Sequence, residues 1–193
     1  MKTTVLRLVL LVLAAALTGG CGSTPPTEYY VLSAQAPAGA HRTRPSIGIV
    51  ELGVAEYLQR PEMVIMQSAN QVRLRDYHLW AEPLEEGVQR TLVLNLGALL
   101  GTDSVRAPPW PRDWAPDWLL RVNVARLDVS GQAIELVAFW SLTHGTDMRE
   151  RSSRLSRARS GDSADSVAAD TSALLLELSE QIAAEIGGTP AGG

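Results

Sequence analysis

Residues 118–143 have the sequence WLLRVNVARLDVSGQAIELVAFWSLT and predict the clearest β-hairpin of the chain. Two apolar-rich segments, residues 118–129 and 132–143, meet at Ser130-Gly131, and such a pair between two strand-like runs is typical of a hairpin turn. Apolar residues alternate along the first segment and then change parity, which predicts one buried face interrupted by a β-bulge; these residues are Leu120, Val122, Val124 and Leu127.

Shorter strand-like segments precede and follow this hairpin. Residues 34–45 are rich in Ala, Gly and Pro and predict a loop. Residues 149–159 predict a polar strand at the edge of the sheet, where charge discourages unwanted pairing. The other predicted strands are residues 28–32, 47–52, 63–67 and 71–75, the last two forming a hairpin around residues 68–70.

Residues 83–100 predict the first of two helices. Pro83 suits the first turn, Glu85 favours the positive end of the helix dipole, and Gly101 is a natural stop. Leu94 lies off the apolar stripe, which predicts that the helix is covered on more than one side. The stripe itself follows i, i+4 spacing: Leu84, Val88, Leu92, Leu96 and Leu99 or Leu100.

The second helix begins after Asp162 or Ser163, either of which can cap its first turn. Gly187-Gly188 ends it, and residues 189–193 are expected to form a disordered tail. Its stripe is Val167, Thr171, Leu174, Leu178, Ile182 and Ile186. The order of strands, helix, strands and helix predicts a single α+β domain over residues 28–188, a mostly antiparallel sheet with both helices packed on one face.

The N-terminus has the features of an export signal. Residues 1–20 combine a short basic start, an apolar run of about ten residues and small residues directly before Cys21. The run is too short to cross a bilayer, which needs roughly 20 apolar residues. Cys21 is the only cysteine of the chain, and this site resembles the bacterial lipobox, in which the cysteine thiol is diacylated and the new N-terminus is acylated. The alternative is ordinary cleavage that leaves a free thiol.

Lipidation at Cys21 would make membrane attachment nearly permanent, since each buried CH₂ contributes about 0.8 kcal/mol and two or three chains are involved. Residues 21–27 then form a lipidated tether that holds the domain close to the membrane, with a reach of roughly 20 Å. Gly22 and Ser23 follow the cysteine without an Asp, which by resemblance to Gram-negative sorting favours the outer membrane.

The composition argues against nucleic acid as a partner. Without residues 1–20 the chain has 173 residues, with 15 Lys and Arg against 21 Asp and Glu, a charge of −6. A surface of that sign does not attract phosphate backbones. No glycine-rich loop of the phosphate-binding type is present, so the sequence predicts no cofactor and no ATP site.

No catalytic constellation stands out. His41, His78 and His144 are scattered and lack a second ligand at metal spacing, which favours surface histidines over a zinc site. Gly161-Asp162-Ser163 is similar to the nucleophile motif of some lipases, but no His follows His144, and a Ser before an amphipathic stripe fits a helix cap. The sequence therefore predicts a protein that is not an enzyme.

Residues 108–118 contain three Trp and four Pro and predict a stiff, bulky loop. Exposed Trp is favoured at interfaces, whereas buried Trp contributes a large apolar area. We expect Trp110 and Trp118 to be buried, and Trp114 fits burial and exposure equally. Exposed parts of this loop, Trp110 and Trp114 in particular, are candidates for contact with a partner protein.

Five arginines form the only dense cationic segment: Arg149, Arg151, Arg154, Arg157 and Arg159. A solvated edge that resists aggregation is the simpler interpretation. The alternative is that Arg151, Arg154 and Arg157 bind an acidic partner or lipid headgroups, because guanidinium groups offer forked hydrogen bonds.

Taken together, the segments resemble the auxiliary lipoproteins of ABC-type lipid transport systems, the PqiC family. The resemblance covers nearly all of the chain after Cys21, and its most specific piece is WAEPLEEG at residues 80–87. The other matching pieces are Tyr29-Tyr30-Val31-Leu32, Tyr57-Leu58-Gln59-Arg60-Pro61, Pro109-Trp110, Ala115-Pro116-Asp117, Trp140 and the closing helix from Leu174 to Ile186. For Trp80 itself, packing on the core where a strand turns into a helix explains the motif without a binding role.

The resemblance implies an outer-membrane lipoprotein that faces the periplasm, works with an MCE-domain protein in moving lipid between membranes, and can assemble into a homo-oligomeric ring. A structural envelope lipoprotein that serves secretion or cell-wall synthesis machinery remains an alternative. A protein that carries lipid in its own pocket is less favoured, because no surplus apolar segment is available to enclose an acyl chain.

Overall fold

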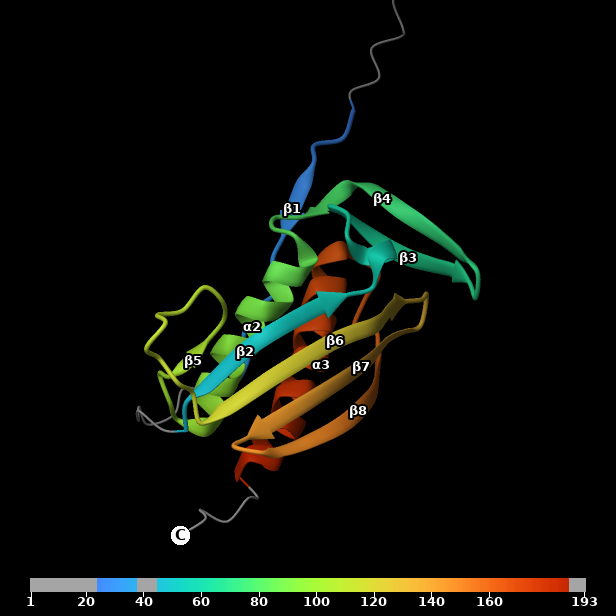
Figure 1. Cartoon of the computed structure of the whole chain (residues 1–193). Coiled ribbons are helices and arrows are strands. Elements are labelled where there is room, and N and C mark those ends of the chain that lie inside the picture. Colours follow the sequence, from blue (N-terminus) through green and yellow to red (C-terminus); the bar gives the residue numbers. More distant parts are fainter. Residues whose placement is uncertain (1–23, 38–44, 188–193) are drawn as a thin grey trace, which may run out of the picture.

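The computed structural model describes residues 24–37 and 45–187. The predicted signal, Cys21, the tail from residue 189, His41 and most of the loop at 34–45 lie outside these residues, and the predictions made for them stay predictions. The predicted single α+β domain is confirmed, with both helices on one face of a sheet (Figure 1).

The predicted hairpin is the centre of a five-stranded sheet with the order β5-β2-β6-β7-β8. Strand β6 (Trp118–Val129) pairs antiparallel with β7 (Ala133–His144), which pairs antiparallel with β8 (Asp147–Ala158). Strand β2 (Ile47–Val54) lies parallel to β6 and to the two-residue strand β5 (Val105–Arg106). The polar strand therefore lies at a sheet edge, as predicted.

The remaining strands form a second, three-stranded sheet in the order β1-β4-β3. Strands β3 (Glu62–Ser68) and β4 (Gln71–Trp80) make the predicted hairpin, and β1 (Glu28–Tyr30) lies parallel to β4. A short 3-10 turn, η1 (Glu56–Leu58), connects β2 with β3. The sheets are thus mixed, because helix α2 lies in the connection between β2 and β6 and lets the two strands run in the same direction.

The alternation of buried residues along β6 changes at a β-bulge, as predicted. The register between β6 and β7 shifts between Val124 and Arg126, so one residue of β6 bulges out of the ladder. The bulge keeps Val124 and Leu127 on the same buried face of the sheet although they are three positions apart.

The two helices begin and end close to the predicted positions. Helix α2 (Leu84–Leu100) follows Pro83 and ends at Gly101, whose left-handed conformation (φ 62°, ψ 40°) suits a residue without a side chain. Helix α3 (Ala164–Gly187) is capped by Ser163, whose Oγ accepts a hydrogen bond of 3.0 Å from the Ser166 N–H.

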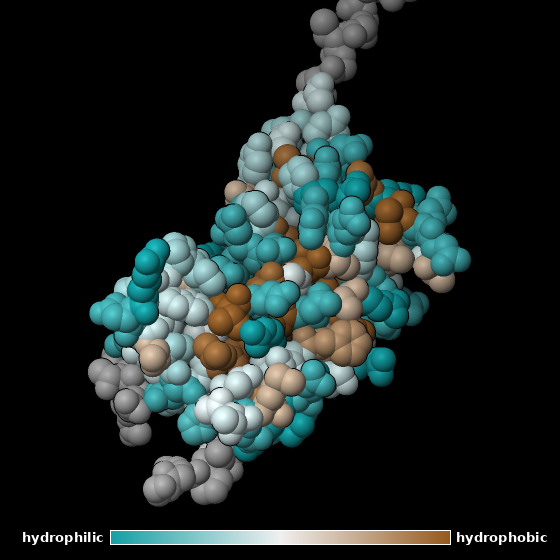
Figure 2. All heavy atoms as spheres, viewed as in Figure 1, coloured by the Kyte–Doolittle hydropathy of each residue, from teal (hydrophilic) through white to brown (hydrophobic). Residues whose placement is uncertain are grey.

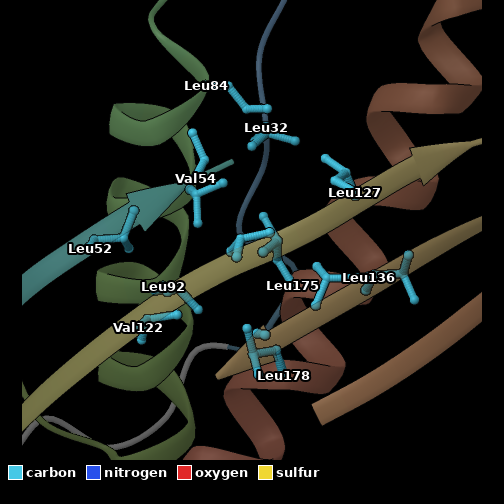
Figure 3. Close-up of a cluster of buried hydrophobic side chains, with 14 of the residues drawn as sticks. Leu32, Leu52, Val54, Leu84, Leu92, Val122, Leu127, Leu136, Leu175 and Leu178 are labelled. Carbon is cyan, nitrogen blue, oxygen red and sulfur yellow. The ribbon is translucent and has the colours of Figure 1, made fainter. Parts of the chain in front are cut away.

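The apolar stripes of the helices pack against the five-stranded sheet and against each other. Figure 3 shows part of this core, with side chains from β2, β6 and β7 facing those of α2 and α3. All six predicted stripe residues of α3 are buried, as are the first four of α2. The expectation for Leu94 is wrong: half of its surface is exposed (50%).

A buried polar chain joins the sheet to α3. The indole N–H of Trp140 donates a hydrogen bond of 2.8 Å to Ser153 Oγ, which donates one of 2.6 Å to Gln181 Oε1. The Ser153 hydroxyl thereby satisfies the indole donor of a buried side chain.

We expect Ser153→Ala to lower the free energy of unfolding by about 1–3 kcal/mol, because the buried indole N–H loses its acceptor. Chemical denaturation measures this change. Ser152→Ala is the matched control, since Ser152 is the exposed neighbour on the opposite face of β8 and should change stability by less than about 0.5 kcal/mol. Equal losses in the two variants would contradict this assignment.

Candidate functional site

The tryptophan loop, residues 107–117, lies on the face of the five-stranded sheet that carries no helix. Ile47 and Ile49 of β2 are fully buried on the helix side, so Gly48 between them faces the opposite side. A Cβ atom at Gly48 would lie only 2.9 Å from Pro116 Cγ and 3.1 Å from Trp110 Cη2. The loop can therefore pack closely against β2 only because Gly48 has no side chain.

The three Trp residues have different environments. Trp118 is buried as predicted and stacks on His144, with ring centroids 4.6 Å apart. Trp110, for which we expected burial, is half-buried and meets the half-buried Trp114 edge to face at 5.4 Å. The Arg106 guanidinium lies over the Trp114 ring at 5.0 Å, a cation–π contact at the outer side of the loop.

The end of the loop is fixed by a reciprocal contact between Asp117 and Ser46. Asp117 Oδ2 accepts hydrogen bonds from the backbone N–H and the hydroxyl of Ser46, at 2.9 and 2.7 Å, and the Asp117 N–H donates to Ser46 Oγ at 2.9 Å. Hydrogen bonds to a carboxylate are stronger than those between neutral groups. This contact explains the Ala115-Pro116-Asp117 piece of the sequence as an attachment point for the loop.

We expect Gly48→Ala to displace the tryptophan loop and to lower stability by about 1–3 kcal/mol, because the new methyl group overlaps Pro116 and Trp110. Near-ultraviolet circular dichroism reports the loop and thermal unfolding the stability. Gly53→Ala in the same strand is the control, since its nearest atom would be Asn123 Oδ1 at 3.8 Å. An unchanged Trp spectrum in Gly48→Ala would contradict the packing described here.

The arginines of β8 separate into two groups by the face of the strand. Arg151 contacts Glu185 at 2.9 Å, and Arg157 contacts Asp170 at 3.4 Å and Glu177 at 3.5 Å, so these cations join the edge strand to α3. Arg149 also pairs with Glu185, and the guanidinium of Arg159 is buried beside Ser130. Arg154 is exposed on the helix-free face, and we find no ion pair or hydrogen bond for its side chain among the described residues.

A shallow hollow lies on the same helix-free face, between the tryptophan loop and Arg154. Its volume is about 520 Å³, and its lining includes Phe139, Asn123 and the ion pair between Arg121 and Glu51. Phe139 of β7 is 53% exposed. Figure 2 shows this face, on which apolar residues along the sheet alternate with hydrophilic ones. Arg151 lines this hollow as well as pairing with Glu185. Arg157 is engaged with Asp170 and Glu177 of α3.

A second cavity forms where two sequence motifs meet. The Trp80 N–H donates a hydrogen bond of 2.7 Å to the Pro61 carbonyl, which brings residues 57–61 against residues 80–87. The resulting cleft has a volume of about 470 Å³ and is lined by Gln59 to Pro61 and by Trp80 to Glu86. Trp80 is buried, which confirms its packing role, and its neighbour Glu82 pairs with Arg90 at 2.5 Å.

Tyr57 holds this cleft to the bulge of β6. Its hydroxyl donates a hydrogen bond of 2.8 Å to Asp128 Oδ1 and accepts one of 3.2 Å from the Leu127 N–H, while Arg126 pairs with the same carboxylate. Burial of the ring, together with the Asp128 carboxylate, raises the pKa of Tyr57 to about 12. In the unfolded chain the tyrosine loses its proton near pH 10. Protonated Tyr57 therefore makes its full contribution to the free energy of unfolding below that pH.

We expect the free energy of unfolding to fall as the pH rises from about 10 to about 12, because the folded state holds the Tyr57 proton more tightly than the unfolded chain. Tyr57→Phe should show a smaller fall over this range, measured by urea unfolding at successive pH values. Tyr29→Phe, which changes an exposed ring, is the control. If the free energy of unfolding fell equally with pH in the wild type and in Tyr57→Phe, the raised pKa of Tyr57 would be refuted.

The described residues offer no metal centre. They contain no group of three or more His, Cys, Asp or Glu side chains placed to hold an ion. His78 lies beside Tyr30 at 3.0 Å, His144 stacks on Trp118, and Ser163 serves as the helix cap. Neither α2 nor α3 combines the length and apolar character needed to span a membrane, and no other helix in the described ranges does.

The family model described as the ABC-type transport auxiliary lipoprotein component matches residues 30–183, from β1 to the last turns of α3. The chain belongs to this family. The resemblance inferred from the sequence motifs is thereby confirmed, and membership identifies an auxiliary component of ABC-type transport. A comparison with curated proteins found no match.

Solved structures share the fold of this auxiliary lipoprotein component. The chain is similar to an uncharacterized protein with a TM-score of 0.70 and 25% identity, over 84% of this chain and 99% of the other. It is also similar to a Xanthomonas campestris protein of the DUF330 family, with a TM-score of 0.66, 16% identity and coverage of 81% and 93%. A PelC dodecamer from Paraburkholderia phytofirmans gives a TM-score of 0.41 at 16% identity, over 74% and 90%.

Sequence reasoning located the tryptophan loop and the arginine strand but missed three features of the site. It did not show that Arg151 and Arg157 face α3, although the acidic residues Asp170, Glu177 and Glu185 recur along that helix. It did not place Phe139 between Trp114 and Arg154. It also treated the motifs at 57–61 and 80–87 as separate, whereas they line one cleft.

Proposed function

We propose that the protein is a non-enzymatic, outer-membrane lipoprotein that docks an MCE-domain periplasmic protein of an ABC-type lipid transporter. The observation that carries this proposal is the family match over residues 30–183. Acylation of Cys21 would supply the anchor, and the domain would face the periplasm. Transport itself, and any ATP hydrolysis, would belong to other subunits.

The helix-free face of the five-stranded sheet is the surface that we assign to the partner. It offers an exposed aromatic residue, Phe139, with the half-buried Trp114 on one side and the exposed cation Arg154 on the other. Aromatic and arginine side chains are enriched among the residues that dominate binding energies. Arg151 and Arg157 from the original set of candidates are assigned to the internal contact with α3.

The alternative partner is an assembly of the secretion or cell-wall synthesis machinery. Assembly of the protein into a homo-oligomeric ring also remains part of the proposal, since a subunit that surrounds a transport path needs several copies. Identification of crosslinked partners from intact membranes separates these cases: an MCE-domain protein supports the proposal, and recovery of secretion or cell-wall components alone would replace it.

We expect Trp114→Ala and Arg154→Ala each to reduce the yield of the crosslinked partner by about fivefold to thirtyfold, as typical for residues at the centre of an interface. The measurement is quantitative mass spectrometry after crosslinking in membranes, with the folded state checked by circular dichroism. Arg157→Ala is the matched control, because it removes the same charge from a side chain that pairs with Asp170 and Glu177 of α3. Unchanged yields with Trp114→Ala and Arg154→Ala would exclude the helix-free face.

A further inference from the structure

A row of exposed apolar side chains begins on the outer side of the three-stranded sheet. Tyr29 in β1 is in register with Leu79 in β4, and such partners on parallel strands point to the same side. Tyr77 lies two positions before Leu79 on the same strand. Tyr29 is 66% exposed and Tyr77 is exposed too, whereas Trp80 on the other side is buried.

The row continues past the end of β1 to helix α2. Val31 is exposed, and with Leu94 it lines a shallow groove of about 560 Å³. Among the seven large hydrophobic residues exposed in the described ranges, four belong to this region. We refer to Tyr29, Val31, Tyr77 and Leu94 as the apolar row. An exposed group of this kind marks a surface that contacts something other than water.

The apolar row lies where the chain leads toward the predicted anchor. Strand β1 lies at one end of the molecule, and the end of α3 lies at the other (Figure 1). Tyr29 follows Cys21 by eight residues, which span at most about 26 Å at ~3.3 Å per residue. A bilayer that holds acyl chains at Cys21 is therefore always within reach of the row.

We propose that the apolar row rests on the surface of the bilayer that holds the lipid anchor. Tyrosine rings favour the boundary between headgroups and acyl chains, because the ring is apolar and the hydroxyl stays wet. The charges beside the row have both signs: Glu82 and Arg90 line the groove with Val31 and Leu94, and they pair with each other. The contact is therefore apolar in character and needs no anionic lipid.

Contact between the apolar row and the bilayer would orient the domain. This inference depends on the proposed lipid anchor at Cys21. With Tyr29 and Tyr77 at the bilayer, β1 is the strand nearest the lipid, and the β7–β8 turn lies at the other end of the molecule (Figure 1). The helix-free face of the five-stranded sheet then remains open to a periplasmic partner. A lipid surface, rather than a second protein, is the occupant that the short tether favours.

The test uses the full lipidated protein in vesicles of phosphatidylethanolamine and phosphatidylglycerol. Cys21 is the only native cysteine and is acylated in this preparation, so a cysteine introduced by Tyr77→Cys or Val31→Cys is the single thiol that a fluorescent probe can label. Met148→Cys provides the matched control, because Met148 is equally exposed but lies at the β7–β8 turn. Nitroxide groups on the lipid headgroups then quench any probe at the membrane surface.

We expect probes at positions 31 and 77 to be quenched at least about twofold more strongly than the probe at position 148, and to stay quenched in high salt. Equal quenching at all three positions would overturn the proposal. Probes at 31 and 77 that are shielded from water without quenching by the lipid would overturn it as well, since a protein would then cover the row. Mass spectrometry of the N-terminal peptide tests the anchor separately, and partner crosslinking tests docking separately.

Discussion

Helices α2 and α3 cover one face of the five-stranded sheet, and the position of every other surface follows from this packing. Burying a Leu, Ile or Val side chain contributes about 1.5–3 kcal/mol, whereas an exposed ion pair contributes about 0–1 kcal/mol. The apolar stripes of the two helices and the inward residues of β2, β6 and β7 therefore hold the fold together. The ion pairs between β8 and α3 align the edge strand with the helix, but the apolar core already stabilises the fold.

Because the helices occupy one face, the functional features are confined to the other face and to the ends of the molecule. The tryptophan loop can lie against β2 only because Gly48 leaves room for Trp110 and Pro116. The same sheet positions Phe139 and Arg154, so a rigid scaffold carries the surface that we assign to a partner.

The order of the elements was predictable because the sequence carries strong local signals. The i, i+4 stripe of α2, the turn at Ser130-Gly131 and the Ser163 cap each depend on residues close together in the chain. The division into two sheets was not predictable, since the parallel pairing of β1 with β4 joins residues about fifty positions apart. The same limit applies to Arg151 and Arg157: alternation along β8 separates two faces, but only the packing of α3 shows which face meets carboxylates.

Strand β1 also determines how the domain responds to mechanical load. Only three residues of β1 pair with β4, and Leu32, which directly follows the exposed Val31, is the first side chain buried in the core. Tension transmitted from a membrane anchor would act on these few hydrogen bonds before it reached the packed helices. Detachment of β1 would lengthen the linker by several residues while Leu32 still held the chain in place. The three-residue ladder of β1, rather than the packed core, is therefore the part of the described fold that would give way first under a pull on the N-terminal segment.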